Sequence, residues 1–103
     1  MIDLNQTEWR EKIANDENAV QLDVRTPFEV EEGYIPNAQV LDVQNPGVFM
    51  DGVNALDKSK NYYVYCRSGG RSVQACMILE SLGFQKTFNL LGGFSEWDGE
   101  KAV

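Results

Sequence analysis

Hydrophobic and polar positions along the chain follow two alternating periods, which together predict an α/β domain. Residues 62–65, Tyr-Tyr-Val-Tyr, form the strongest strand signal, because aromatic and β-branched residues favour extended backbone. In residues 71–82 apolar positions recur every three or four residues, the spacing of one helix face. Similar patterns predict further strands at 20–24, 39–43 and 87–91, and further helices at 6–14, 27–32 and 46–56. Strands that alternate with helices in this way indicate a largely parallel sheet.

Local signals at the helix ends support these bounds. Asn5 is a favourable N-cap for the first helix, and Glu8 three residues later completes the spacing of a capping box. Pro27 suits the first turn of the short second helix, and Gly33 suits its end. Because no repeat, low-complexity run or linker interrupts the pattern, residues 1–103 are expected to form a single domain.

Composition narrows the class of protein. The chain has 103 residues, of which 43% are hydrophobic, enough for one buried core. It has no apolar run of the roughly 20 residues that span a membrane, and its first residues lack the basic start and apolar stretch of a signal peptide. We therefore expect a soluble, cytoplasmic protein with no membrane partner. The net charge of −7 disfavours nucleic acid as a partner, because such binding relies on dense lysine and arginine.

The chain contains no histidine and only two cysteines, Cys66 and Cys76. The absence of histidine excludes Cys-His and Ser-His-Asp catalysis and any metal site that needs a histidine ligand. The two cysteines do not form a CxxC pair, and two thiols are too few for a disulfide framework. A reactive thiol would have to be held as a thiolate by backbone amides, a helix end or arginine. No metal or organic cofactor is implied.

The segment after the strongest strand carries the candidate chemistry. Cys66 comes directly after this strand, where the active groups of parallel sheets lie. Gly69 and Gly70 allow positive φ angles and close backbone approach, so that successive N–H groups can point inward and bind an anion. The next helix adds its positive N-terminal end, and Arg67 and Arg71 add charge. These groups would hold a thiolate, and equally the anionic outer sulfur of a persulfide.

This segment resembles the active-site loop of the rhodanese-like domain family in its residues Cys66-Arg67-Ser68-Gly69-Gly70-Arg71-Ser72. Residues 22–29 resemble the first signature of the family, residues 33–38 the second, and residues 83–97 the C-terminal one. The resemblance implies a three-layer domain with a central, mostly parallel sheet of about five strands flanked by helices. It also implies a sulfurtransferase that moves sulfane sulfur through a cysteine persulfide. The donor would be a small anion such as thiosulfate, and the acceptor would be cyanide, a thiol or a protein.

The resemblance assigns a role to each residue of the loop. Cys66 matches the nucleophile and sulfur carrier, and Arg67 and Arg71 match positions that attract an anionic donor. Ser68 through Ser72 match positions whose backbone amides line the cradle. The Ser72 hydroxyl is also expected to cap the following helix.

Two positions depart from the pattern of the family. Tyr34 stands where the second signature carries histidine, a position that is usually structural in the family. Ser68 stands where threonine is more frequent and keeps the hydroxyl group. Neither departure removes a group that the proposed chemistry needs.

Two other functions remain open. The first is a cysteine-dependent phosphatase or arsenate reductase of related fold; such phosphatases hold phosphate in a loop one residue longer than the loop from Cys66 to Arg71. The second is a binding or regulatory module without turnover, although such domains often lack the cysteine. A further hypothesis, compatible with a sulfurtransferase, is that the donor is a protein persulfide and the acceptor is a biosynthetic protein.

Other polar or reactive residues are expected to be structural. Cys76 lies on the apolar face of the helix after the loop and reads as a small core residue, although a resolving thiol is the alternative. Asp23 and Arg25 read as an ion pair at a strand end, and the acidic residues of 29–32 read as a solvated face.

Overall fold

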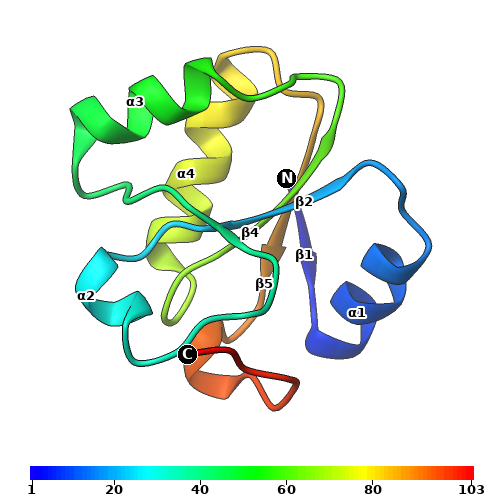
Figure 1. Cartoon of the computed structure of the whole chain (residues 1–103). Helices are drawn as coiled ribbons and strands as arrows, with labels where there is room; N and C mark the ends of the chain where they lie inside the picture. The colour runs from blue at the N-terminus through cyan, green and yellow to red at the C-terminus, as the bar shows by residue number, and fades with distance from the viewer.

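The computed structural model describes residues 1–103 as one five-stranded sheet with helices on both faces (Figure 1). The strands lie in the order β1-β5-β4-β2-β3, and every pairing is parallel. The predicted α/β fold and its parallel sheet are thereby confirmed. In chain order the elements are β1 (Ile2–Leu4), α1 (Gln6–Ala14), β2 (Ala19–Asp23), α2 (Pro27–Val30), β3 (Gln39–Val40), α3 (Pro46–Asn54), β4 (Asn61–Tyr65), α4 (Gly70–Ser81), β5 (Lys86–Leu90) and the 3₁₀ turn η1 (Phe94–Glu96).

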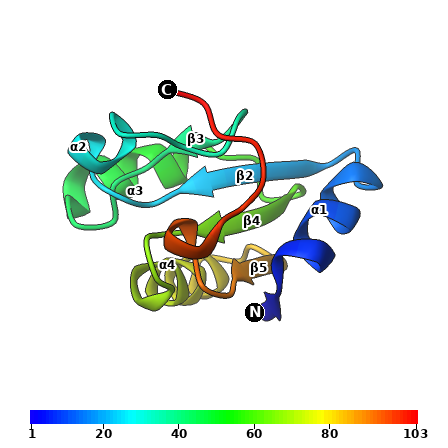
Figure 2. The same ribbon diagram turned by 90° about the horizontal axis from the view of Figure 1, so that it is seen from below.

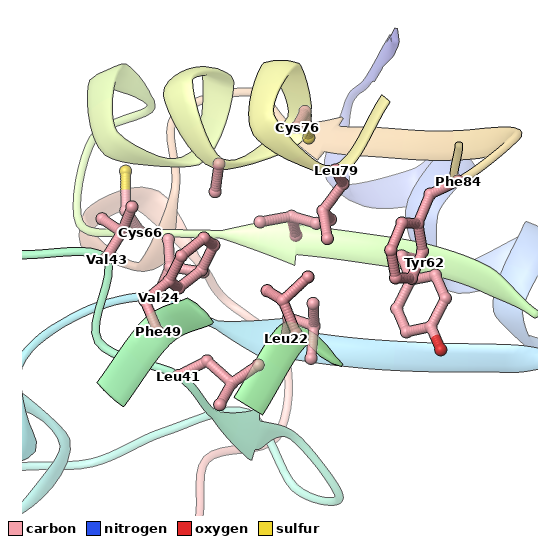
Figure 3. Close-up of a cluster of buried hydrophobic side chains, with 13 residues drawn as sticks. Leu22, Val24, Leu41, Val43, Phe49, Tyr62, Cys66, Cys76, Leu79 and Phe84 are labelled. Atoms are coloured by element: carbon pink, nitrogen blue, oxygen red, sulfur yellow. The ribbon is translucent and has the colours of Figure 1, made fainter. Parts of the chain in front are cut away.

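Two hydrophobic clusters cover the two faces of the sheet. One packs α3 and α4 against β2 and β4, and Figure 3 shows ten of its residues labelled. The other lies beneath α1 and the C-terminal segment and is rich in aromatic rings. In Figure 2 this C-terminal segment, drawn in red, crosses the strands on the face away from α3 and α4. The sheet is therefore the middle layer of three.

Most predicted elements occur with bounds that differ by one or two residues. The capping box of α1 is complete: Asn5 Oδ1 accepts from the Glu8 N–H at 2.9 Å, and the Glu8 carboxylate accepts from the Asn5 N–H at 2.9 Å. The strand predicted at 39–43 is shorter, because only Gln39–Val40 has regular strand geometry. Beyond it the Leu41 N–H still donates to the Asp23 carbonyl oxygen at 2.9 Å, so the segment stays attached to β2.

β1 is the strand that the sequence pattern did not predict. It has three residues, two of them exposed, so it shows no alternation of buried and exposed positions. Its pairing with β5, Ile2 with Phe88 through Leu4 with Leu90, makes it a strand. A strand this short depends on a partner that lies far away in the sequence, which local propensity does not report.

The alternation of side chains along β4 decides where Cys66 points. Tyr62 and Val64 belong to the cluster under α3 and α4, whereas Tyr63 and Tyr65 belong to the cluster on the other face. Cys66 continues this alternation and lies on the α4 side. A shift of one residue in the register of β4 would move the thiol to the opposite face, so the sheet pairing positions the site.

No helix has the length and apolar character that a membrane span needs.

Candidate active site

Cys66 lies at the C-terminal end of the central strand, directly before the loop 67–69 and the first turn of α4. Figure 3 shows its sulfur pointing toward that first turn. Gly69 is the N-cap of α4 and has a φ of 122°, in the region that favours glycine, as predicted. The same prediction is wrong for Gly70: its φ is not positive, and a Cβ there would meet no atom within 4 Å.

The sulfur of Cys66 has hydrogen-bond partners in the loop and in the first turn of α4. The Gly69 N–H donates to Sγ at 3.0 Å, and the Cys66 thiol donates to the Ser72 Oγ at 3.4 Å. Burial alone would raise the pKa of the Cys66 thiol. Once the thiol ionises, the Ser72 hydroxyl and the backbone N–H groups of Ser72, Gly69 and Ser68 stabilise the thiolate by more than burial disfavours it, so the pKa falls below its ordinary value. A thiolate is thus stabilised in a chain that has no histidine to act as a base.

The thiol is covered by its own loop. Only 1% of Cys66 is exposed, whereas Arg67 and Ser68, which follow it, are exposed. Burial at this level strengthens every hydrogen bond to the sulfur, because water does not compete for it.

The segment after β5 supports the loop from behind. The Phe94 N–H donates to the Cys66 carbonyl oxygen at 2.9 Å, and the Ser95 N–H donates to the Arg67 carbonyl oxygen at 2.9 Å. Gly93 makes this contact possible, because a Cβ at this position would lie 2.5 Å from the Arg67 oxygen. Its φ of 58° with a ψ of −160° also suits glycine.

The two arginines of the loop have different surroundings. Arg71 pairs with Glu29 through two hydrogen bonds of 2.6 and 2.9 Å, and this pair lowers the pKa of Glu29 to about 2. Both side chains are about one-fifth exposed. Arg67 is exposed and makes no ion pair. The charge of Arg71 is therefore largely neutralised by Glu29, and Arg67 is the free cation of the loop.

A cleft of about 360 Å³ lies beside the loop, and its lining includes Arg67 and Lys101. Lys101 belongs to the C-terminal segment, which is held by two backbone hydrogen bonds between Tyr34 and Ala102, of 3.0 and 2.8 Å. The Lys101 ammonium group lies 5.4 Å from the centroid of the Phe94 ring. The cleft therefore has two cations without an ion pair, Arg67 and Lys101, and also two carboxylates, Glu29 and Glu32, while Cys66 is not among its lining residues.

Ser72 differs from its predicted role. It lies in the first turn of α4, but that helix has no side-chain cap. Its hydroxyl lies 2.5 Å from Asn89 Oδ1 and 3.0 Å from the Gly69 carbonyl oxygen. The expected capping function is wrong, because Gly69 occupies the N-cap position of α4 and Ser72 lies inside the first turn.

Most of the residues predicted to be structural are placed accordingly, but Glu29 is not part of a solvated face, because its partly buried carboxylate pairs with Arg71. Cys76 is fully buried in the cluster under α4. Figure 3 shows it on α4 itself, whereas Cys66 lies at the end of β4.

Asp23 and Arg25 form a buried ion pair with an N–O distance of 2.7 Å. The guanidinium group of Arg25 also donates to the Gly33 carbonyl oxygen at 2.8 Å and lies over the Phe94 ring. The ion pair therefore contacts Phe94, whose N–H donates to the Cys66 carbonyl oxygen.

Three residues that shape the site had no predicted role: Asn89, Gly93 and Lys101. Asn89 and Gly93 lie in the segment 83–97, which resembles a signature of the family. That resemblance marked the segment but did not indicate what these two residues do. For Lys101 no signal was available. It reaches the cleft only because the C-terminal segment folds back across the sheet (Figure 2).

Comparisons with known proteins agree with this geometry. The rhodanese-like domain family matches residues 6–100. A Bacillus subtilis protein named as a candidate sulfurtransferase, YtwF, is 43% identical over 91 residues, which cover 88% of this chain and 84% of that protein. A protein of Allochromatium vinosum named sulfurtransferase is 36% identical over 87 residues, covering 84% of this chain and 78% of that protein.

Solved structures give the same result. A rhodanese-like domain protein from Staphylococcus aureus superposes with a TM-score of 0.85 at 30% identity, covering 100% of this chain and 98% of that one. A rhodanese-related protein from Thermoplasma volcanium gives a TM-score of 0.85 at 27% identity, covering 99% and 98%. With the matched residues spanning nearly its whole length, the chain belongs to the rhodanese-like domain family.

Proposed function

We propose that this protein is a sulfurtransferase in which Cys66 carries sulfur as a persulfide from an anionic donor to a thiophilic acceptor. The observation that carries the proposal is the set of backbone N–H groups at Ser68, Gly69 and Ser72 that act on the Cys66 sulfur. They stabilise a sulfur anion where no general base is present. Relatives named for sulfurtransferase activity support this choice among thiol chemistries.

In the first step the Cys66 thiolate attacks the outer sulfur of a donor such as thiosulfate. A new S–S bond forms at Cys66, the S–S bond of thiosulfate breaks, and its electron pair leaves with sulfite. One thiolate and one thiosulfate dianion thus become one persulfide anion and one sulfite dianion. The loop donors then hold the outer sulfur of the persulfide, so charge is stabilised before and after transfer.

In the second step a nucleophile such as cyanide attacks the outer sulfur. The S–S bond of the persulfide breaks, the electron pair returns to Cys66 as thiolate, and thiocyanate leaves. The enzyme alternates between two covalent states, so donor and acceptor bind in turn.

In this proposal the unpaired cations of the cleft bind the anionic sulfur donor. Arg67 and Lys101 face a space beside the loop, whereas Arg71 is held by Glu29. An anionic donor is drawn to the free cations and approaches Cys66 from this side. Because Cys66 is 1% exposed, the donor reaches its sulfur only if the surrounding residues open a path to it.

Intact-mass spectrometry tests the proposal directly. After incubation with thiosulfate the protein should gain the mass of one sulfur atom, and cyanide should remove it. Cys66→Ser should gain nothing. Cys76→Ala is the matched control, since it removes the other thiol of the same cluster, and it should load sulfur like the wild type.

Two outcomes would contradict the proposal. A folded wild type that takes no sulfur, from thiosulfate or from a small persulfide, would favour a binding module. Hydrolysis of an aryl phosphate that is lost in Cys66→Ser would favour a phosphatase.

A further inference from the structure

A line of hydrogen bonds runs from Cys66 through the sheet to a residue far from the loop. The Ser72 Oγ lies 3.4 Å from the Cys66 Sγ and 2.5 Å from the Asn89 Oδ1. The Asn89 Nδ2 in turn donates to the Asp3 Oδ1 at 3.0 Å. Asp3 and Asn89 are paired residues on β1 and β5, so the sheet register brings them together. Because Asn89 is 2% exposed, water does not replace a hydrogen-bond partner that its amide loses.

The direction of each hydrogen bond follows from the chemistry of the groups. The carboxylate of Asp3 only accepts, so the NH₂ group of Asn89 must face it. The amide oxygen of Asn89 then faces Ser72, and an oxygen acceptor requires the Ser72 hydroxyl to donate. A hydroxyl has a single hydrogen, so this hydrogen is directed toward Asn89 and the Ser72 lone pairs are left for the thiol.

We propose that Asn89, oriented by Asp3, is a positioning residue that holds the Ser72 hydroxyl as an acceptor for the Cys66 thiol, so that ionisation of Cys66 requires this hydroxyl to turn. In the thiolate state the sulfur attracts the hydroxyl hydrogen, and Asn89 then loses its donor in a buried site. Asn89 therefore favours the thiol over the thiolate. The Gly69 carbonyl oxygen, 3.0 Å from Ser72 Oγ, is a further neutral acceptor that every variant below retains.

The charged groups around the sulfur come from several elements. Arg71 on α4 interacts with the charge of Cys66 and is paired with Glu29 on α2, and Asp42 before α3 also acts on Arg71. Arg67 lies in the loop itself, and the Asp23–Arg25 pair lies after β2. All of these stay unchanged in variants of Asn89 and Ser72, so they cannot account for a difference between those variants.

The inference rests on the proposed function only in taking Cys66 as the reacting thiol. Its test needs no sulfur transfer. The rate of alkylation of Cys66 by iodoacetamide, followed peptide by peptide against pH, reports the thiolate fraction. Access through the loop scales every rate alike, whereas the midpoint of the pH profile reports ionisation.

The first experiment removes the acceptor. In Asn89→Leu, which is similar in volume, the Ser72 hydroxyl is free to donate to the sulfur anion. Below the midpoint the thiolate fraction should rise about 2- to 10-fold, the range that corresponds to the net worth of one hydrogen bond. In a Ser72→Ala background the same Asn89→Leu change should have no effect, because the hydroxyl that it releases is gone. Thermal melting of each variant shows that it is folded.

The second experiment acts on Asp3, an exposed residue with no contact to the loop. In Asp3→Leu the Asn89 amide loses its anchor, can turn its NH₂ toward Ser72, and should shift the profile in the same direction as Asn89→Leu. Asp3→Asn removes the same negative charge but keeps an acceptor oxygen, so its profile should stay close to that of the wild type. The pair thus separates orientation of the amide from loss of charge.

Three results would overturn the inference. They are coincident profiles for Asn89→Leu and wild type, an Asn89→Leu shift that persists in Ser72→Ala, and equal shifts in Asp3→Leu and Asp3→Asn. Sulfur loading measured in parallel keeps the two proposals apart. A wild type that loads sulfur while the profiles coincide refutes only the role of Asn89. Shifted profiles without sulfur loading refute only the sulfurtransferase.

Discussion

Cys66 and Cys76 lie in the same hydrophobic cluster and are equally buried, at 1% and 0% exposure. Their ionisation is nevertheless shifted in opposite directions. Burial raises the pKa of the Cys76 thiol to about 12, whereas the donors around Cys66 lower its pKa despite burial. Burial alone therefore does not decide whether a cysteine reacts.

The partners of the two sulfurs explain the difference. At Cys76 burial raises the pKa, and the hydrogen bond with the Thr87 side chain offsets this only in part. The Cys76 thiol also donates to the Phe88 carbonyl oxygen at 4.0 Å. Cys66 faces the Gly69 N–H at 3.0 Å, a donor that stabilises the thiolate. A regular helix has no free N–H groups at the position of Cys76, but its first turn has them at the position of Cys66. The position of each thiol relative to the first turn of α4 thus determines how readily it ionises.

The largest expected effect is the ratio of reactivity between the two thiols. With a pKa of about 12 against one below the ordinary value of 9, Cys76 should hold at least about 1000-fold less thiolate than Cys66 at neutral pH. Alkylation by iodoacetamide in the folded protein, resolved by peptide mass, measures both rates in one sample. Comparable rates would show that the two environments do not differ as described.

The next effect concerns the support behind the loop. Gly93→Ala places a Cβ 2.5 Å from the Arg67 carbonyl oxygen in a backbone conformation that suits glycine. We expect a loss of about 2–4 kcal/mol in the free energy of unfolding, measured in denaturant. The pKa of Cys66 should also rise as the loop amides move away, with alkylation of Cys76 unchanged.

Gly70→Ala is the control for that substitution, because it adds the same methyl group at the first residue of α4, where no atom lies within 4 Å. It should leave stability and the alkylation profile nearly unchanged. If Gly93→Ala has the same stability and the same alkylation profile as Gly70→Ala, the close approach of Gly93 to Arg67 does not shape the site.

The smallest effect is the pH dependence that Cys76 contributes to stability. The unfolded thiol ionises near its ordinary pKa of 9, but the folded one keeps its proton up to about 12. The folded state binds more protons in this window, so stability falls as the pH rises through it. At pH 11 the loss should reach about 3 kcal/mol relative to neutral pH.

Cys76→Ala should lose stability less steeply between pH 9 and 11 than the wild type, in denaturant unfolding at a series of pH values. Tyr63 and Tyr65 also have raised pKa values and contribute equally to both proteins. Parallel curves for wild type and variant would indicate that Cys76 ionises normally in the fold.

Much of the fold could be predicted because it depends on local pattern. The strand 62–65 and the helix 71–82 were found within a residue or two, since their apolar periodicity reports burial directly. β1 escaped prediction because its three residues become a strand only beside β5. The strand at 39–43 was predicted too long, because an edge strand has a partner on one side only and ends where that pairing becomes irregular.

The candidate site divides in the same way. The cysteine, the positive φ of Gly69 and the N–H groups of a helix start all follow from adjacent residues. The neutralisation of Arg71 by Glu29 could not be predicted, because 42 residues separate them. The same holds for the contacts of Ser72 with Asn89 and of Asn89 with Asp3, which cross three elements.

The order of residues along the chain determined that a thiol would follow a central strand and precede a helix, and so would meet free backbone N–H groups. Only the tertiary structure decided how far this thiol is covered, which arginine remains unpaired, and which groups lie within hydrogen-bond distance of the Ser72 hydroxyl. The physical reason is range: backbone conformation is set by neighbours in sequence, whereas burial and the choice of hydrogen-bond partner are set by segments that pack together only in the folded chain.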